Sequence, residues 1–262
     1  FDVVGASFPG MPAFAHFGHN DSVAWCVTHT AADYQDLYIE QFREPSNAGN
    51  SRYYLYQGQW LRAEVFQECI QVRGGDNVDI QVFVTHHGSV ISDSPQSGTG
   101  IAFRYTATDG PSIWVTGLVE MLMAKDSKHL MESMRDWVDP VNNFVFADVH
   151  GSIGYLCRGE IPIRSMDNAR LPVPGWTGEH EWQGTIPFEE LPRLVDPELG
   201  YIATANNRPV DDDYPYYIAL DFTPGFRAER VTKALLPMEN IKTVDMAQVH
   251  AERVSIPARE YI

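Results

Sequence analysis

Residues 144–158 read FVFADVHGSIGYLCR, and this stretch decides the fold class. Two runs rich in Val, Ile, Phe and Tyr, 144–150 and 153–158, lie on either side of the turn residues Gly151 and Ser152. β-Branched and aromatic runs that flank a short turn are typical of two strands that pair antiparallel. The stretch therefore predicts a β-hairpin.

The sequence before this hairpin is dominated by further short strands. Runs of similar composition recur between turn residues at 22–28, 37–42, 53–57, 64–72, 78–85 and 101–106. This spacing indicates an antiparallel meander rather than β-α-β units. The clearest helical pattern lies within 113–138, where Asp126-Ser127 predicts a break and an N-cap and Asp139-Pro140 predicts the end.

The sequence after the hairpin is rich in loops and returns to helices. Prolines recur from 162 to 209, a helix is predicted over 228–236, and a further one from Asp245 onward. No linker-like composition divides the chain. We therefore expect one domain over residues 1–262, of the α+β class.

Composition excludes several classes of function. The 262 residues carry 19 Lys+Arg against 35 Asp+Glu, a formal charge of −16, which argues against nucleic acid or an anionic membrane as partner. No apolar run approaches the roughly 20 residues of a membrane span. Because the sequence starts with Phe1 and shows no signal-peptide pattern, we expect a processed or interior piece of a longer protein.

The cysteines and histidines favour structural roles. Cys26, Cys69 and Cys157 are far apart and form no CxxC pair, so we expect three small buried side chains. His16 and His19, and the adjacent pair His86-His87, lack a metal-binding spacing such as HExxH. Each histidine is therefore interpreted as structural.

Two polar stretches are candidates for chemistry. Asp33, Asp36 and Glu40 could offer oxygen ligands to a hard cation, although spacing alone favours a solvated acidic loop. Residues 204–209, TANNRP, could present an Asn amide to a developing oxyanion, or could be only a turn before a proline. The hydrolase motif GxSxG and the phosphate-binding glycine motifs do not occur.

Several short ordered motifs extend over nearly the whole chain. They are Phe8-Pro9-Gly10, Gly18-His19-Asn20, Ala24-Trp25, Thr28, Asp33, His87-Gly88, 147–155 (ADVHGSIGY), 171–175 (LPVPG), Trp182-Gln183-Gly184, 200–207 (GYIATANN) and 227–231 (RAERV). Each motif is short, but the collinear set is specific, and it resembles the penicillin acylase (penicillin amidase) family of N-terminal nucleophile hydrolases. Cys26 departs from the pattern, because the family has Gly there.

The resemblance implies a fold and a reaction. The fold is a four-layer αββα sandwich with antiparallel sheets, and it would be incomplete in this fragment. In the family a precursor cleaves itself, and the new β-chain begins with the nucleophile, whose own α-amino group acts as base. We therefore expect an interior fragment of a β-chain whose nucleophile-bearing N-terminal strands and partner α-chain lie outside these residues.

The resemblance also assigns roles to individual positions. Asn206 matches the side-chain donor of the oxyanion hole, His29 the backbone N–H donor, and Arg230 an arginine near the nucleophile's amino group. The acyl-pocket positions are Phe17, Val27 and Ala31. Asp33, Gln35 and Asp36 match a structural Ca²⁺ site, with Ala169 as a loose further match, and no organic cofactor is implied.

Two functional hypotheses follow. In the first, the intact protein cleaves a linear acyl amide, with penicillins and N-acyl-homoserine lactones as candidate substrate classes and an aliphatic or an aromatic acyl group equally allowed. In the alternative, the chain is a non-catalytic binding or structural domain on the same scaffold. The residue that begins the intact β-chain distinguishes them. The resemblance further implies a periplasmic or extracytoplasmic location, and the isolated fragment is predicted to be inactive.

Overall fold

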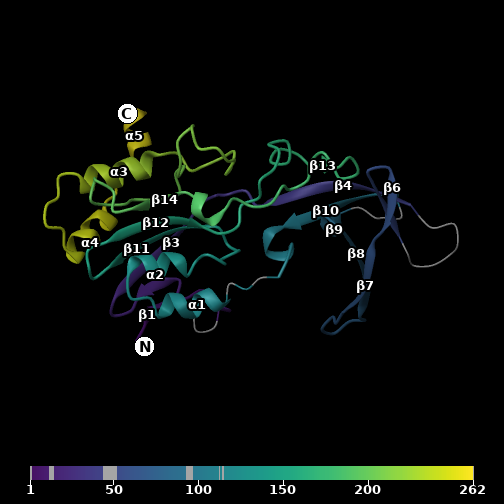
Figure 1. Cartoon of the computed structure of the whole chain (residues 1–262), viewed down its shortest axis with the longest axis horizontal. Helices are drawn as coiled ribbons and strands as arrows, with labels where there is room; N and C mark the ends of the chain where they lie inside the picture. Colours follow the sequence, from purple (N-terminus) through teal and green to yellow (C-terminus); the bar gives the residue numbers. More distant parts are fainter. Residues whose placement is uncertain are drawn as a thin grey trace.

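Two β-sheets dominate the computed structural model, which describes residues 2–11, 15–43, 52–92, 97–111, 113 and 115–261. The sheets extend toward opposite ends of the molecule, and the chain passes from one to the other between β3 and β4 (Figure 1). Both sheets are built from antiparallel pairs, apart from the parallel pairing of β13 with β4. The predicted α+β class with antiparallel sheets is confirmed.

The first sheet has six strands in the described part of the chain. Their order is β1 (Val4–Ala6), β2 (Phe17–His19), β3 (Val23–His29), β11 (Asn142–Asp148), β12 (Ile153–Arg158) and β14 (Arg193–Val195). The predicted hairpin is the β11–β12 pair, in which Phe144 lies opposite Leu156. Its other neighbour is β3, with Phe144 opposite Val27, so the sequence-distant β3 and not a meander neighbour completes the centre of this sheet.

The second sheet contains most of the predicted meander, but the predicted strand 22–28 is wrong in its place, because it lies in the first sheet as β3. Its order is β6 (Gln59–Arg62), β5 (Tyr53–Tyr56), β4 (Gln35–Arg43), β10 (Thr99–Tyr105), β9 (Gly88–Ser92), β8 (Val78–Thr85) and β7 (Glu64–Ile70), with β13 (Val173–Pro174) beside β4. Strands β7 to β10 follow one another as a meander. Strand β4 lies between β5 and β10, which places its first residues next to the crossing from the first sheet.

One face of the first sheet is covered by the helices α1 (Val115–Leu122) and α2 (Ser127–Glu132), which lie across it in Figure 1. Strand β3 alternates between buried and less buried positions, and Val23, Trp25 and Val27 pack into the same buried cluster as Met121 and Leu130. This alternation has the period of two that a half-covered strand requires. The main hydrophobic core therefore lies between the first sheet and these two helices.

The remaining helices follow the loop-rich segment, as the sequence indicates. They are α3 (Phe226–Leu235), α4 (Thr243–Ala251) and α5 (Ile256–Glu260), and they lie together at the end of the molecule away from the second sheet (Figure 1). Helix α3 contacts both α4 and α5. The described part of the chain contains no helix that is long and apolar enough to cross a membrane.

Side-chain caps connect the helices to the first sheet. Asp126 is the N-cap of α2, as predicted, and its side chain accepts a hydrogen bond from the His129 N–H at 2.7 Å. The Asn20 amide donates to the carbonyls of Leu122 and Ala124 at 3.1 and 2.8 Å, just beyond the last turn of α1. The Gly18-His19-Asn20 motif thus fixes the β2–β3 turn against the end of a helix.

The expectation of three buried cysteines is wrong for two of them. Cys157 on β12 is buried, but Cys26 and Cys69 are exposed. Cys26 lies on the face of β3 opposite the helices, and Cys69 lies on β7, where nearly every side chain faces solvent. The composition of a strand cannot show which of its faces is covered. The prediction that Cys26 and Cys69 are buried was wrong for this reason.

Candidate active site

The end of β3 and the loop 201–209 form the candidate catalytic region. Asn206 adopts a left-handed backbone conformation with φ of 65°, which Asn tolerates better than most residues. Its Nδ2 donates a hydrogen bond to the His29 carbonyl at 2.7 Å. The structure therefore brings together two predicted site residues that are 177 positions apart.

Arg227 holds the Asn206 side chain from the other side. Its Nη2 donates to the Asn206 Oδ1 at 2.9 Å and to the Ala205 carbonyl at 2.8 Å. With its oxygen engaged by a cation, the amide presents its NH₂ group toward the end of β3. Sequence reasoning named Arg230 and not Arg227, although the spacing of three positions on one helix places both on the same side.

A cavity of 870 Å³ opens beside these residues and reaches the C-terminal helices. Asn206, Arg227 and Arg230 line it, together with Thr28 from β3. Arg230 faces Glu252, with 2.8 Å between Nε and the carboxylate Oε1 and a second contact through Nη2. The Arg230 guanidinium is thus neutralised by a partner that sequence reasoning missed.

A buried polar network supports the end of β3 from below. Asn143 on β11 donates through Nδ2 to the His29 carbonyl and to Thr28 Oγ1, both at 3.1 Å. The Tyr155 hydroxyl donates to Asn143 Oδ1 at 2.7 Å. Buried polar groups that satisfy one another in this way hold a single geometry. The His29 carbonyl is therefore fixed by two amides, from Asn143 and Asn206.

Three described hydroxyl or thiol groups, those of Thr28, Ser7 and Cys157, show no arrangement typical of an activated nucleophile. Thr28 Oγ1 lies 3.2 Å from the Thr204 hydroxyl and 3.1 Å from the Asn143 amide, and neither group is a base. Ser7 donates to the backbone carbonyls of Phe8 and Met11. Burial raises the pKa of the Cys157 thiol to about 12, so the reactive thiolate is scarce.

The predicted acyl-pocket residues lie in three different environments. Phe17 on β2 is partly exposed, and its ring lies 6.0 Å from that of Phe8. Val27 points into the helix-covered core, and Ala31 lies in the crossing between the sheets with φ of 63°. None of the three lines the 870 Å³ cavity, nor a second cavity of 590 Å³ that has Arg164 in its wall. Their role in an acyl pocket stays a prediction.

The predicted calcium ligands lie where the chain enters the second sheet, and they already face a cation. The guanidinium of the buried Arg164 lies 2.6 Å from Asp36 and 3.1 Å from Asp33. Burial raises the pKa of Asp33 above its ordinary value, and Arg164 counteracts this increase. Since one guanidinium occupies the charge position between both carboxylates, this arrangement does not fit a calcium ion as it stands. The calcium site that the resemblance implies at Asp33, Gln35 and Asp36 is therefore untested, and the buried Arg164 argues against it.

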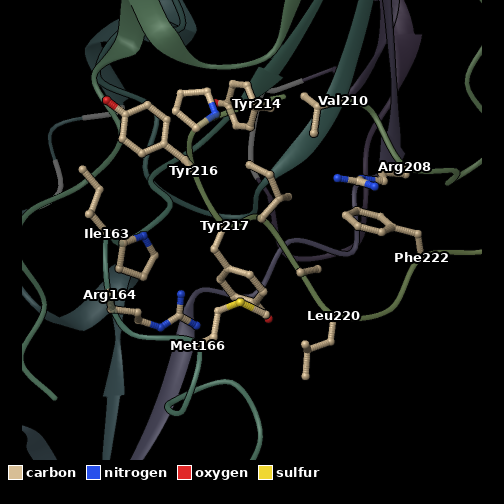
Figure 2. Close-up of a pocket in the computed structure, with 14 residues that line it drawn as sticks. Ile163, Arg164, Met166, Arg208, Val210, Tyr214, Tyr216, Tyr217, Leu220 and Phe222 are labelled. Atoms are coloured by element: carbon tan, nitrogen blue, oxygen red, sulfur yellow. The ribbon is translucent and has the colours of Figure 1, made fainter. Parts of the chain in front are cut away.

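The second cavity, of 590 Å³, has Arg164 in its wall (Figure 2). Tyr214, Tyr216 and Tyr217 line it, with Phe222 and Arg208 on the far side. The Tyr217 hydroxyl donates to Asp33 at 3.1 Å, which joins the cavity wall to the Arg164 cluster. Nothing in the sequence distinguished this segment from a solvated loop, because its tyrosines follow three adjacent aspartates.

The architecture agrees with the hydrolase class that the motifs suggested, and three comparisons support that class. The profile of the penicillin amidase family matches residues 1–262, so the chain belongs to this family. A solved structure of thermostable penicillin G acylase from Alcaligenes faecalis superimposes with a TM-score of 0.76 at 27% identity, covering 95% of this chain and 44% of that chain. This match confirms the expected N-terminal nucleophile hydrolase fold.

Curated relatives bear the names of acylases. The chain is 40% identical to penicillin acylase 2 proenzyme of Pseudomonas sp. (strain SE83), with 97% of this chain and 32% of that protein covered. It is 33% identical to penicillin G acylase of Escherichia coli, with 94% of this chain and 28% of that protein covered. It is 31% identical to acyl-homoserine lactone acylase QuiP of Pseudomonas putida, with 89% of this chain and 28% of that protein covered. The chain thus spans about a third of the length of these relatives.

Proposed function

We propose that the intact protein hydrolyses a linear acyl amide through an acyl-enzyme on an N-terminal Ser. The hydroxyl oxygen attacks the amide carbon while the α-amino group of the same residue accepts the proton. The proton then passes to the leaving amine, and water hydrolyses the ester to release the acid. Asn206 Nδ2–H and the His29 backbone N–H stabilise the oxyanion of each tetrahedral intermediate.

The observation that carries this proposal is the fixed orientation of the Asn206 amide. Arg227 holds its oxygen, and the His29 carbonyl accepts one of the two N–H groups on Nδ2. An amide nitrogen carries two donors, so one remains for a substrate oxygen at the end of β3. A donor that needs no rearrangement during the reaction is what oxyanion stabilisation requires.

The nucleophile in this proposal belongs to a segment outside the 262 residues. The support is that Thr28, Ser7 and Cys157 show no activation, and that one relative is named a proenzyme. We accordingly propose that the α-chain and the rest of the β-chain of one precursor complete the site. Penicillins and N-acyl-homoserine lactones are the candidate substrate classes, and a periplasmic or extracytoplasmic location is the accompanying proposal.

Replacing Asn206 in the mature protein tests the oxyanion assignment. Asn206→Asp keeps the shape and the contact with Arg227 but replaces the donating NH₂ by an oxygen. Turnover of a chromogenic acyl amide should fall about 10²–10³-fold, the usual result of losing one oxyanion donor. The neighbouring Asn207→Asp change is the matched control, because the Oδ1 that accepts from the Ala205 N–H is retained.

Two results would overturn the proposal. A correctly processed Asn206→Asp protein with normal turnover would remove Asn206 from the oxyanion site. Mass spectrometry of the mature N-terminus provides the second criterion, since an uncleaved precursor without a terminal Ser, Thr or Cys would exclude the acyl-enzyme mechanism and favour a binding domain.

A further inference from the structure

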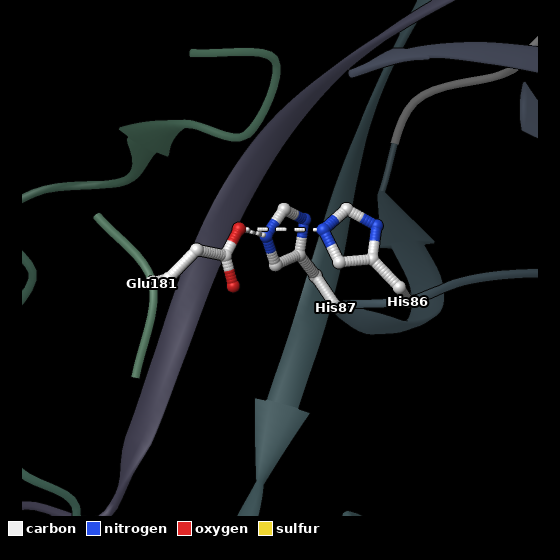
Figure 3. Close-up of side chains that lie close together, drawn as sticks. All are labelled: His86, His87 and Glu181. Atoms are coloured by element: carbon white, nitrogen blue, oxygen red, sulfur yellow. Dashed lines mark hydrogen bonds and ion pairs between the residues drawn. The ribbon is translucent and has the colours of Figure 1, made fainter. Parts of the chain in front are cut away.

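Two imidazoles and one carboxylate converge on a point in the second sheet, away from the residues assigned to hydrolysis (Figure 3). His86 and His87 lie in the turn between β8 and β9, and Glu181 lies in the segment after β13. The Glu181 Oε1 is 2.8 Å from His87 Nε2 and 3.3 Å from His86 Nε2. Adjacent residues on a regular strand point to opposite faces, but in this turn the two rings lie 3.8 Å apart.

Each of these three side chains is also held at its other polar atom. His87 Nδ1 lies 2.8 Å from Glu40, His86 Nδ1 lies 3.2 Å from the Tyr54 hydroxyl, and the second oxygen of Glu181 accepts from Arg104 at 3.2 Å. Metal-binding histidines and carboxylates are commonly oriented by such outer contacts. The contacts leave both Nε2 atoms and one Glu181 oxygen directed at the same point.

The charge around the cluster favours a cation. Glu40 is fully buried, and its Oε2 has no hydrogen-bond partner in the described part of the chain. The carboxylates of Glu181 and Asp109 contact one guanidinium, that of Arg104, and the third carboxylate, Glu40, contacts the His87 imidazole. With neutral imidazoles this leaves a surplus of two negative charges, which a divalent ion would balance.

We propose that His86 Nε2, His87 Nε2 and Glu181 Oε1 bind a divalent transition-metal ion, with Zn²⁺ as the best fit. Nitrogen and oxygen ligands at about 2.0–2.2 Å from zinc lie roughly 3.4 Å from one another in a tetrahedral site. In the structure the Glu181 oxygen lies 2.8 and 3.3 Å from the two imidazole nitrogens, and all three ligand atoms lie within 4.8 Å of one another. Imidazole excludes calcium and magnesium as preferred ions. The partly exposed side chains of His86 and Glu181 leave the fourth position to water.

The bound ion would tie two distant segments together. Glu181 precedes Trp182, whose indole N–H donates to Asp36, and the Trp182 ring stacks on the Arg104 guanidinium. An ion on Glu181 would therefore fix the loop that covers the Asp36–Arg164 pair. This site does not depend on the proposed hydrolysis.

Zinc titration of metal-free mature protein tests the proposal. Calorimetry should show one saturable equivalent of Zn²⁺, and Co²⁺ should give the visible absorption bands of a site with imidazole ligands and low coordination number. His86→Ala removes a half-exposed ligand and should weaken zinc binding by at least about 10-fold while the protein stays folded. Glu181→Gln, which keeps the side-chain shape, should have a similar effect.

The matched control is His129→Ala, because His129 lies on α2 and pairs with Glu120, away from this cluster. It should bind zinc like the parent protein, and circular dichroism in metal-free buffer should be the same for all variants. Absence of a saturable equivalent in the parent, or unchanged binding in both His86→Ala and Glu181→Gln, would show that the cluster is only a hydrogen-bonded network.

Discussion

Arg164 decides what the pair of carboxylates at the start of β4 can do. Its side chain and that of Asp36 are both fully buried, and their closest atoms are 2.6 Å apart. The Arg164 guanidinium supplies the positive charge between the two carboxylates that a bound calcium ion would otherwise supply. No residue pattern near position 164 indicated this, because the partners are more than a hundred residues apart and only the fold brings them together.

Replacing Arg164 should therefore be costly and should change the response to calcium. Arg164→Gln leaves Asp36 buried without its cation, which typically lowers the free energy of unfolding by about 3–5 kcal/mol. Denaturant unfolding measures this loss, and the exposed Arg170→Gln is the control. Adding calcium should leave the melting temperature of the parent unchanged and raise that of Arg164→Gln. A calcium-dependent melting temperature in the parent would contradict this account and support a calcium site.

At the scale of elements, the β11–β12 hairpin and α2 are linked by one carboxylate. Asp148 accepts hydrogen bonds from the N–H groups of Ser127, His150 and Ser152, at 2.9, 2.9 and 3.0 Å. The first contact is at the start of α2, and the other two close the hairpin turn. Partial burial alone would raise the pKa of Asp148, but these hydrogen bonds lower it to about 2.

This shift predicts a dependence of stability on pH. Because the folded pKa lies below the ordinary value for Asp, the unfolded chain takes up the proton first as pH falls. The contribution of Asp148 is therefore complete above about pH 5 and is lost as pH falls toward about 2. Asp148→Asn should lower the free energy of unfolding by about 1–3 kcal/mol at pH 7. The difference from the parent should shrink at pH 3, and a difference independent of pH would contradict the assignment.

The elements themselves were largely predictable, and the reasons are local. The strands Val78–Thr85 and Ile153–Arg158 have the predicted bounds, because each is a β-branched run between turn residues. The N-cap at Asp126 was also predictable, because its signal is local in the sequence. Pairing was not predictable from composition, since β3 joins β11 and not a neighbour in sequence. For the candidate site, family motifs predicted Asn206, His29 and Arg230. The contacts made by Arg227, Glu252 and Arg164 emerged only from the fold.

At the scale of the whole molecule, the two sheets differ in how much of their strands is buried. Strands β7 and β8 form a ribbon that extends from the second sheet (Figure 1). Among the described residues, β8 pairs with β9 only at Val84 and Thr85. Most side chains of the ribbon are exposed. In contrast, β11 lies between β3 and β12 and packs against the main core.

Hydrogen exchange should follow this difference. Amides of residues 66–80 should exchange much faster than those of 142–158, because few buried contacts oppose local opening of the ribbon. Mass spectrometry of peptides from the exchanging protein measures both segments in one experiment. Equal protection of the two segments would show that the ribbon is covered in solution.

The pairing of β3 with β11 also affects how the protein is made. Thr30 and Asn143, which are hydrogen-bonded at the end of this pair, are 113 residues apart. At about 5–20 residues per second, a ribosome needs on the order of 10 s to synthesise the intervening chain. For most of that interval, until residues 115–132 have also been translated, Val23, Trp25 and Val27 have no strand to join on this side and no helix to cover them. The nascent chain therefore presents an apolar strand to chaperones for seconds before its partner has been translated.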